Sequence, residues 1–220
     1  MAHGAPSETA RHTRTVDQPG YDALAQLYAD TFPDAFTSSL ERAAVDAFLG
    51  SLPGPRIVDV GCGIGHVAAH IAERGGTVVG VEPSPNMLAL ARAAHPGLDL
   101  RAGDAGLAGL ELGGFDGALA RYSLIHLPPD EVRAVLRDWH ARLPDGAVLL
   151  VATQSTDDPG VHPFDHAVAP AWRWHPDALA EAVTDAGFAE QWRLISRPDG
   201  MAHHRFPELH LAARKQREIL

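Results

Sequence analysis

The chain has 220 residues and a formal net charge of −10, with 45% hydrophobic and 21% charged residues. This length suits one domain with a sizeable core, and the acidic balance argues against a nucleic-acid or anionic-membrane partner. A single cysteine, Cys62, excludes an intrachain disulfide, and no apolar run reaches the roughly 18 residues of a membrane span, so we expect a cytoplasmic protein that acts on a small molecule.

The N-terminal fifth of the chain predicts a tail and two helices. Residues 1–20 are polar, contain proline and lack periodicity, which predicts a disordered or loosely attached tail. From residue 21 to residue 36 the apolar residues follow an amphipathic stripe at Leu24, Leu27, Tyr28 and Phe32. Pro33 should bend or end this helix, and a second helix is expected over 40–49.

Strands and helices then alternate. The pattern predicts strands over 56–60, 77–82, 98–102, 115–120 and 147–153, with helices over 64–74, 84–95 and 129–143. Such alternation favours a parallel sheet with helices on both faces, in which the carboxyl ends of the strands share one edge. Polar residues fall at or near these ends, at Asp59, Glu82, Asp104 and Arg121. We therefore expect one ligand site along that edge.

The last third of the chain reads differently. The alternation lapses after Thr153 and resumes at His175. A helix is then expected over 176–186, followed by strands over 188–196 and 210–214. There is no internal repeat, and no second domain is predicted.

A glycine turn follows the first strand as Gly61-x-Gly63-x-Gly65. A dinucleotide turn would read G-x-G-x-x-G/A, but His66 stands at the last position. With an acidic residue before the turn (Asp59) and another ending the second strand (Glu82), the segment resembles the class I S-adenosylmethionine-dependent methyltransferases.

The resemblance implies a fold and a domain plan. The fold would be a single Rossmann-like α/β domain over residues 21–220, with a mostly parallel seven-stranded sheet and a C-terminal antiparallel hairpin. Within it, residues 21–50 would form a helical lid, 56–154 the cofactor-binding core, and 155–220 an acceptor-side insert with the hairpin. The small bacterial enzymes that modify secondary metabolites are the members that the chain resembles most.

The resemblance also implies a binding site for S-adenosylmethionine. Glu82 would accept hydrogen bonds from the two ribose hydroxyls, and Asp104 from the adenine amino group. For Asp59 the alternatives are contact with the cofactor and a bracing role through backbone amides. The whole predicted cofactor set is Tyr21, Asp59, Gly61, Cys62, Gly63, Glu82, Pro83, Met87, Asp104, Ala105, Arg121 and His126.

The acceptor side is less well specified. His126, just beyond the fourth strand, and His166 are the candidate catalytic bases, because histidine titrates near neutral pH. The predicted acceptor contacts are Tyr28, Phe32, Tyr122, His162, His166, Trp172 and Trp174. The aromatic residues among them could equally be core. No metal site is predicted, because Pro163 interrupts the spacing of His162 and His166.

The sequence thus predicts methyl transfer to an oxygen or nitrogen of a small-molecule acceptor by in-line substitution, with a monomer or homodimer as the active species. Three alternatives stay open: a cyclisation or elimination that uses the same bound cofactor, an NAD-dependent oxidoreductase, and a binding module with a decayed site.

Overall fold

The computed structural model describes residues 20–198, 200 and 205–216. The predicted tail lies outside the described residues except for Gly20, which begins the first helix.

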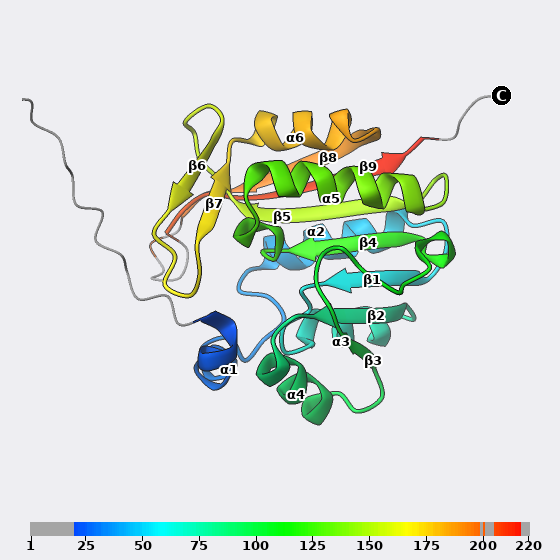
Figure 1. Cartoon of the computed structure of the whole chain (residues 1–220), viewed down its shortest axis with the longest axis vertical. Coiled ribbons are helices and arrows are strands. Elements are labelled where there is room, and N and C mark those ends of the chain that lie inside the picture. Colours follow the sequence, from blue (N-terminus) through cyan, green and yellow to red (C-terminus); the bar gives the residue numbers. More distant parts are fainter. Residues whose placement is uncertain (1–19, 199, 201–204, 217–220) are drawn as a thin grey trace, which may run out of the picture.

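The centre of the fold is a seven-stranded sheet with the strand order β3-β2-β1-β4-β5-β9-β8 (Figure 1). The five neighbours from β3 to β5 are parallel, β9 is antiparallel to β5, and β8 is antiparallel to β9. The strands are β1 (Arg56–Val60), β2 (Thr77–Glu82), β3 (Asp99–Ala102), β4 (Gly117–Arg121), β5 (Val148–Gln154), β8 (Phe188–Ser196) and β9 (Glu208–Lys215). The predicted fold class is confirmed, including the C-terminal hairpin.

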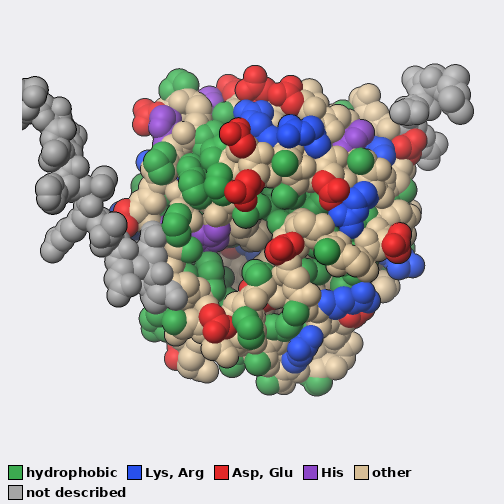
Figure 2. Space-filling model, viewed as in Figure 1, with side chains coloured by type: hydrophobic (Ala, Val, Ile, Leu, Met, Phe, Trp, Pro, Cys, Tyr) green, Lys and Arg blue, Asp and Glu red, His purple; other side chains and the backbone are tan. Residues whose placement is uncertain are grey.

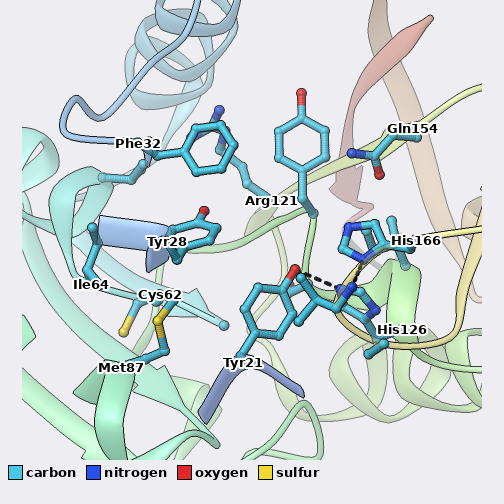
Figure 3. A pocket seen from close by; sticks show the side chains of 18 of the residues that line it. Tyr21, Tyr28, Phe32, Cys62, Ile64, Met87, Arg121, His126, Gln154 and His166 are labelled. Atoms are coloured by element: carbon cyan, nitrogen blue, oxygen red, sulfur yellow. Dashed lines mark hydrogen bonds between the residues drawn. The ribbon is translucent and has the colours of Figure 1, made fainter. Parts of the chain in front are cut away.

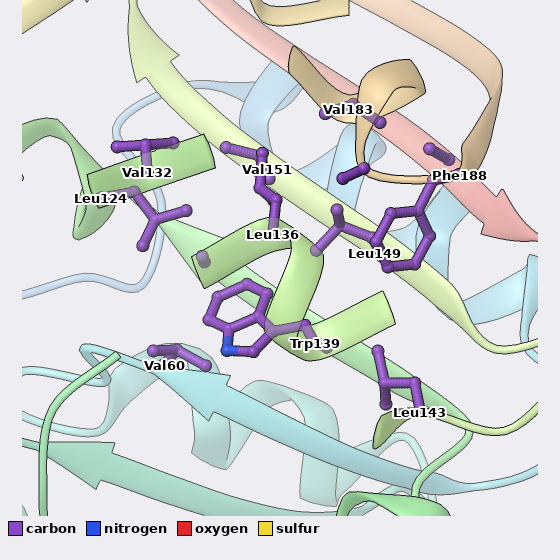
Figure 4. Packing of buried hydrophobic residues seen from close by; sticks show 14 of the residues in the cluster. Val60, Leu124, Val132, Leu136, Trp139, Leu143, Leu149, Val151, Val183 and Phe188 are labelled. Carbon is purple, nitrogen blue, oxygen red and sulfur yellow. The ribbon is translucent and has the colours of Figure 1, made fainter. Parts of the chain in front are cut away.

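Helices cover both faces of the sheet because the strands are apolar on both sides. They are α1 (Gly20–Thr31), α2 (Ser39–Ser51), α3 (His66–Glu73), α4 (Pro85–Ala94), α5 (Pro129–Arg142) and α6 (Pro176–Asp185), with short 3-10 turns η1 (Leu112–Gly114) and η2 (Leu124–His126). Phe48 of α2 and Ile71 of α3 pack on one face with Ile57 of β1. Trp139 of α5 and Val183 of α6 belong to the core on the other face (Figure 4).

The sequence missed a second, two-stranded sheet. Here β6 (Val161–Phe164) pairs antiparallel with β7 (Ala171–Trp174), within the stretch where the alternation lapses. Strands of four residues, one of them holding Pro163, are too short to show a period. In Figure 1 this hairpin lies at one end of the large sheet, on the same side as α1.

Helix α1 makes hydrogen bonds to two separate parts of the chain near the carboxyl ends of the parallel strands. Its first residue donates a backbone hydrogen bond from Gly20 N to Val168 O (2.9 Å), in the loop between β6 and β7. Its Asp22 accepts from Ser84 Oγ (3.0 Å) and from Asn86 N (2.9 Å) at the start of α4. Leu27 is 61% exposed, so the predicted apolar stripe does not point wholly inward. The helix therefore spans the space between α4 and the β6–β7 hairpin.

Candidate functional site

A cavity of about 620 Å³ opens along the carboxyl edge of the parallel strands. On the face shown in Figure 2, hydrophobic side chains with histidine among them gather over β6, β7 and α1. Every residue of the predicted cofactor set lines the cavity, as do Tyr28, Phe32, Tyr122 and His166 from the predicted acceptor set. The residues predicted at the strand ends therefore share one cavity.

The glycine turn needs its glycines for two reasons. Gly61, Gly63 and Gly65 have φ of 72°, 56° and 83°, a region that strains any residue with a Cβ. A Cβ on Gly61 would also collide with the side chain of Ser123. The turn is tied to the second strand because Gly61 N and Cys62 N both donate to Val81 O (2.7 and 3.1 Å).

Glu82 is a buried carboxylate that the backbone holds in one position. Gly63 N donates to its Oε2 and Ser84 N to its Oε1, both at 2.9 Å. Burial raises the pKa of Glu82, and the two backbone hydrogen bonds oppose that rise. Each oxygen keeps a further lone pair for a ligand hydroxyl.

Asp59 lies beneath the turn with one oxygen unsatisfied. The side chain is 3% exposed, and Oδ2 has no hydrogen-bond partner in the part of the chain that the structure describes. Burial, together with the negative charge of Glu82, raises the pKa of Asp59 to about 7, against the lowering effect of Arg121. A buried acceptor of this kind calls for a donor, ideally a cationic one.

Cys62 also lines the cavity, but its environment does not suit a nucleophile. Burial and the nearby carboxylates of Asp59 and Glu82 raise the pKa of the thiol, so it stays protonated at neutral pH. The side chain packs with Leu88 and Leu100, which agrees with a packing role.

The loop after β3 is fixed from behind by α5. Trp139 Nε1 donates to Ala105 O (2.8 Å), and Arg142 Nη1 donates to Gly106 O (2.9 Å). Asp104 caps the same loop, since its Oδ1 accepts from Gly106 N at 2.9 Å. Asp104 is exposed, so its second oxygen is accessible to a ligand.

A tyrosine and two histidines meet in the middle of the cavity (Figure 3). Tyr21 Oη lies 2.9 Å from His126 Nε2, and His126 Nδ1 lies 2.9 Å from Pro170 O. A carbonyl only accepts, so Nδ1 carries the ring proton and the Tyr21 hydroxyl donates to Nε2. Burial raises the pKa of Tyr21 and lowers the pKa of His126, so both are neutral near pH 7.

His166 carries its ring proton on the other nitrogen. Val168 N donates to its Nδ1 (3.2 Å), so the neutral ring carries its proton on Nε2. Burial and the neighbouring His126 lower the pKa of His166 to about 4. Of the two predicted bases, His126 is therefore the one whose acceptor nitrogen bonds a cavity side chain, the hydroxyl of Tyr21, whereas that of His166 bonds a backbone amide.

A buried charged network missing from the sequence prediction centres on Glu41. Arg121 Nη2 lies 3.3 Å from Glu41 Oε2, and Tyr122 Oη donates to Glu41 Oε1 at 3.2 Å. Both side chains of the ion pair are 10% exposed or less. Tyr122 has a φ of 53°, which is unusual for a residue with a side chain. Arg121 thus lines the cavity but already has a carboxylate partner.

Three predicted acceptor contacts do not line the cavity. Trp174 is 1% exposed within the core, and Trp172 lies beside it in β7 without reaching the cavity. The His162 ring bonds the Pro159 carbonyl (2.9 Å), also away from the cavity. Successive side chains of a strand point to opposite faces, and the β6–β7 hairpin turns part of each strand toward the core. For this reason not every aromatic residue predicted there reaches the cavity.

Several cavity residues went unnoticed in the sequence. They include Glu41, Gln154, Phe164, Phe206 and Glu208. Gln154 could have been found, because it ends β5 as Glu82 ends β2. The others lie far from any motif and are brought in by the tertiary fold.

Comparison with known proteins decides the nature of the core. Residues 57–146 match the family model described as "Methyltransferase domain". Residues 57–146 form a methyltransferase domain. This confirms the resemblance carried by the glycine turn, and it supports S-adenosylmethionine over NAD as the cofactor of the domain.

Individual relatives match parts of the chain. An O-methyltransferase of Pyrenophora dematioidea is 31% identical over 153 residues, which cover 62% of this chain and 55% of that protein. The chain spans about half the length of the curated relatives it matches.

Solved structures share the fold at lower identity. The 1,6-didemethyltoxoflavin-N1-methyltransferase of Burkholderia thailandensis, with 1,6-didemethyltoxoflavin and S-adenosylhomocysteine bound, is 23% identical with a TM-score of 0.67, over 98% of this chain and 94% of that chain. The cyclase SpnF is 19% identical with a TM-score of 0.71, over 90% of this chain and 98% of that chain. At these identities the likeness concerns the fold.

Among the described residues no group of three or more His, Cys, Asp and Glu side chains could hold a metal ion. No helix in the described part of the chain has the length and apolarity to cross a bilayer.

Proposed function

We propose that the protein transfers a methyl group from S-adenosylmethionine to an oxygen or nitrogen of a small-molecule acceptor. The observation that carries the proposal is one continuous cavity that contains the glycine turn and Glu82 together with the Tyr21–His126 pair.

The residues at the glycine turn fit this cofactor. The two Glu82 oxygens have free lone pairs for two ribose hydroxyls, and the unsatisfied Asp59 Oδ2 suits the amino group of the methionine part. Gly63 leaves space near the backbone, because a Cβ there would meet only Met87 Cε, at 3.4 Å. When bound, the cofactor supplies an electrophilic methyl group on a sulfonium.

The protein contributes alignment, exclusion of water and removal of a proton. An acceptor hydroxyl can donate to Tyr21 Oη while Tyr21 passes its own proton to His126 Nε2. The Pro170 carbonyl holds the ring in the tautomer that leaves Nε2 free to accept. Because the pKa of His126 is lowered by burial, the ring is in the accepting form at neutral pH.

The test is an assay with isotopically labelled S-adenosylmethionine and a panel of phenols and nitrogen heterocycles. We expect labelled product and S-adenosylhomocysteine in equal amounts, and a much slower reaction with His126→Asn. Product without stoichiometric S-adenosylhomocysteine would instead support a cyclisation or elimination, the reaction type in the name of the cyclase of similar fold. No turnover of any acceptor by protein that binds the cofactor would contradict the proposal.

A further inference from the structure

The acceptor end of the cavity has aromatic walls. Tyr28 of α1 and Phe32, the residue after α1, have ring centroids 4.9 Å apart, and Phe164 and Phe206 have centroids 5.3 Å apart. Figure 3 shows Tyr28 and Phe32 on one side of the cavity and Gln154 with His166 on the other. Phe164 packs beside His166, with centroids 5.6 Å apart. Walls of this kind suit a flat ring system.

The second pair of rings is fixed from outside the cavity. The Arg173 guanidinium lies 4.2 Å from the centroid of the Phe206 ring and 5.8 Å from that of Phe164. Arg173 itself does not line the cavity. A cation held over both rings limits their movement, so the wall keeps its shape without a ligand.

Gln154, in the wall of this cavity, has an unsatisfied amide oxygen. It is the last residue of β5, lines the cavity, and has a buried Oε1 without a hydrogen-bond partner in the described part of the chain. Of the other polar groups that line the cavity, Tyr122 bonds Glu41 and His126 bonds Tyr21, whereas Ser123 Oγ and Arg121 Nε are also unsatisfied among the described residues. A buried amide oxygen without a partner is costly, so a ligand donor would be strongly favoured there.

We propose that Gln154 selects the acceptor, and that the acceptor is a flat heteroaromatic molecule with a ring N–H next to a ring carbonyl. This inference rests on the proposed function, since it assigns the acceptor for the same cavity. The Gln154 oxygen accepts from the ring N–H and its NH₂ donates to the carbonyl. Amide side chains read the edge of adenine with the same paired geometry. Rotation of the terminal amide by half a turn allows either order of the two ring groups.

The experiment compares two probes that differ in one atom. In 2-quinolone the ring N–H adjoins the carbonyl, whereas coumarin has an oxygen in place of that N–H. Binding of each is measured by calorimetry with S-adenosylhomocysteine present, for the wild type, Gln154→Met and the control Gln191→Met. Gln191 is an exposed glutamine on β8, away from the cavity. We expect the wild type and the control to prefer 2-quinolone about tenfold, and Gln154→Met to lose that preference, as for one paired amide contact.

The outcomes separate this inference from the proposed function. Equal affinity of the wild type for both probes, binding of neither, or a preference that survives in Gln154→Met would overturn the inference alone. Failure of the wild type to bind S-adenosylhomocysteine would overturn the proposed function and the inference with it. The comparison of the two probes on the wild type decides the matter even if Gln154→Met does not fold.

Discussion

The two ends of the cavity differ in what holds their polar groups in place. At the cofactor end the backbone does so: Glu82 is fixed by the amides of Gly63 and Ser84. At the acceptor end side chains also hold other side chains: Tyr21 bonds His126 across 105 positions in the sequence, in addition to the backbone bonds of Pro170 O to His126 and of Val168 N to His166. A backbone-built end suits a ligand that is the same in every reaction, whereas an end built from side chains can change its acceptor through substitutions.

The largest effect should come from the proton acceptor at the acceptor end. His126→Ala should lower kcat for a hydroxyl acceptor about a thousandfold, because general-base catalysis of this kind contributes roughly 10²–10⁴. The Kd for S-adenosylhomocysteine should change little, which calorimetry can measure beside the rate. The matched variant His162→Ala alters a histidine outside the cavity and should keep the wild-type rate. An equal loss in both variants would show that His126 does not act as the base.

The next largest effect should fall on the cofactor end. Glu82→Ala removes the carboxylate that we propose binds two ribose hydroxyls, and it leaves Gly63 N and Ser84 N without their acceptor. The Kd for S-adenosylhomocysteine should rise about 100-fold, since a hydrogen bond to a charged group contributes about 1.5–3 kcal/mol. Asp99→Ala, on the exposed part of the neighbouring strand, is the control. If Glu82→Ala bound S-adenosylhomocysteine with wild-type affinity, the glycine-turn end of the cavity would not be the cofactor end.

A pH titration tests how the ionisation of Asp59 affects binding at the cofactor end of the cavity. With a pKa of about 7, Asp59 becomes ionised as pH rises through neutrality, and the ionised form is the one that attracts a cationic amino group. Affinity for S-adenosylhomocysteine should therefore increase from about pH 6 to about pH 8 in the wild type. In Asp59→Asn the affinity should be lower at the higher pH, by about tenfold, and should no longer follow this titration.

The same residue should affect stability in the opposite sense. The pKa of Asp59 in the folded protein lies above the ordinary value of 3.8, so its contribution to stability is lost as pH rises through about 7. Without cofactor, Asp59→Asn should therefore have a higher Tm than the wild type at about pH 8, with a smaller difference at about pH 5. A lower Tm for the variant at the higher pH would show that ionised Asp59 is stabilised by the fold itself.

The smallest effect should come from the lid, which touches both ends. Asp22→Ala removes the acceptor for Ser84 Oγ and Asn86 N, so α1 is held less firmly over the cavity. Loss of about 1 kcal/mol of docking should raise both the Kd for the cofactor and the KM for the acceptor roughly fivefold. Asp30→Ala, at an exposed site on the same helix, should leave both unchanged. A change in the Kd for the cofactor alone, or in the KM for the acceptor alone, would show that α1 contributes to only one end of the cavity.

The comparison also explains which parts of the site were predictable. Gly61 and Glu82 could be placed at the cavity because each lies at the end of a buried strand, and Asp104 because the family resemblance supplied a local pattern after the short strand β3. The pairing of Glu41 with Arg121 could not, because α2 and β4 are far apart in the sequence and no motif links them. Trp174 looked like an acceptor contact, but four-residue strands give too little pattern to show which side chains face the core.

The most direct test is calorimetric titration of the purified protein with S-adenosylmethionine, S-adenosylhomocysteine and NADH. The account predicts that the first two bind, that they compete for one site per chain, and that NADH does not bind. Binding of NADH alone would contradict the assignment of the glycine turn and of Glu82, and with them the division of the cavity into a cofactor end and an acceptor end.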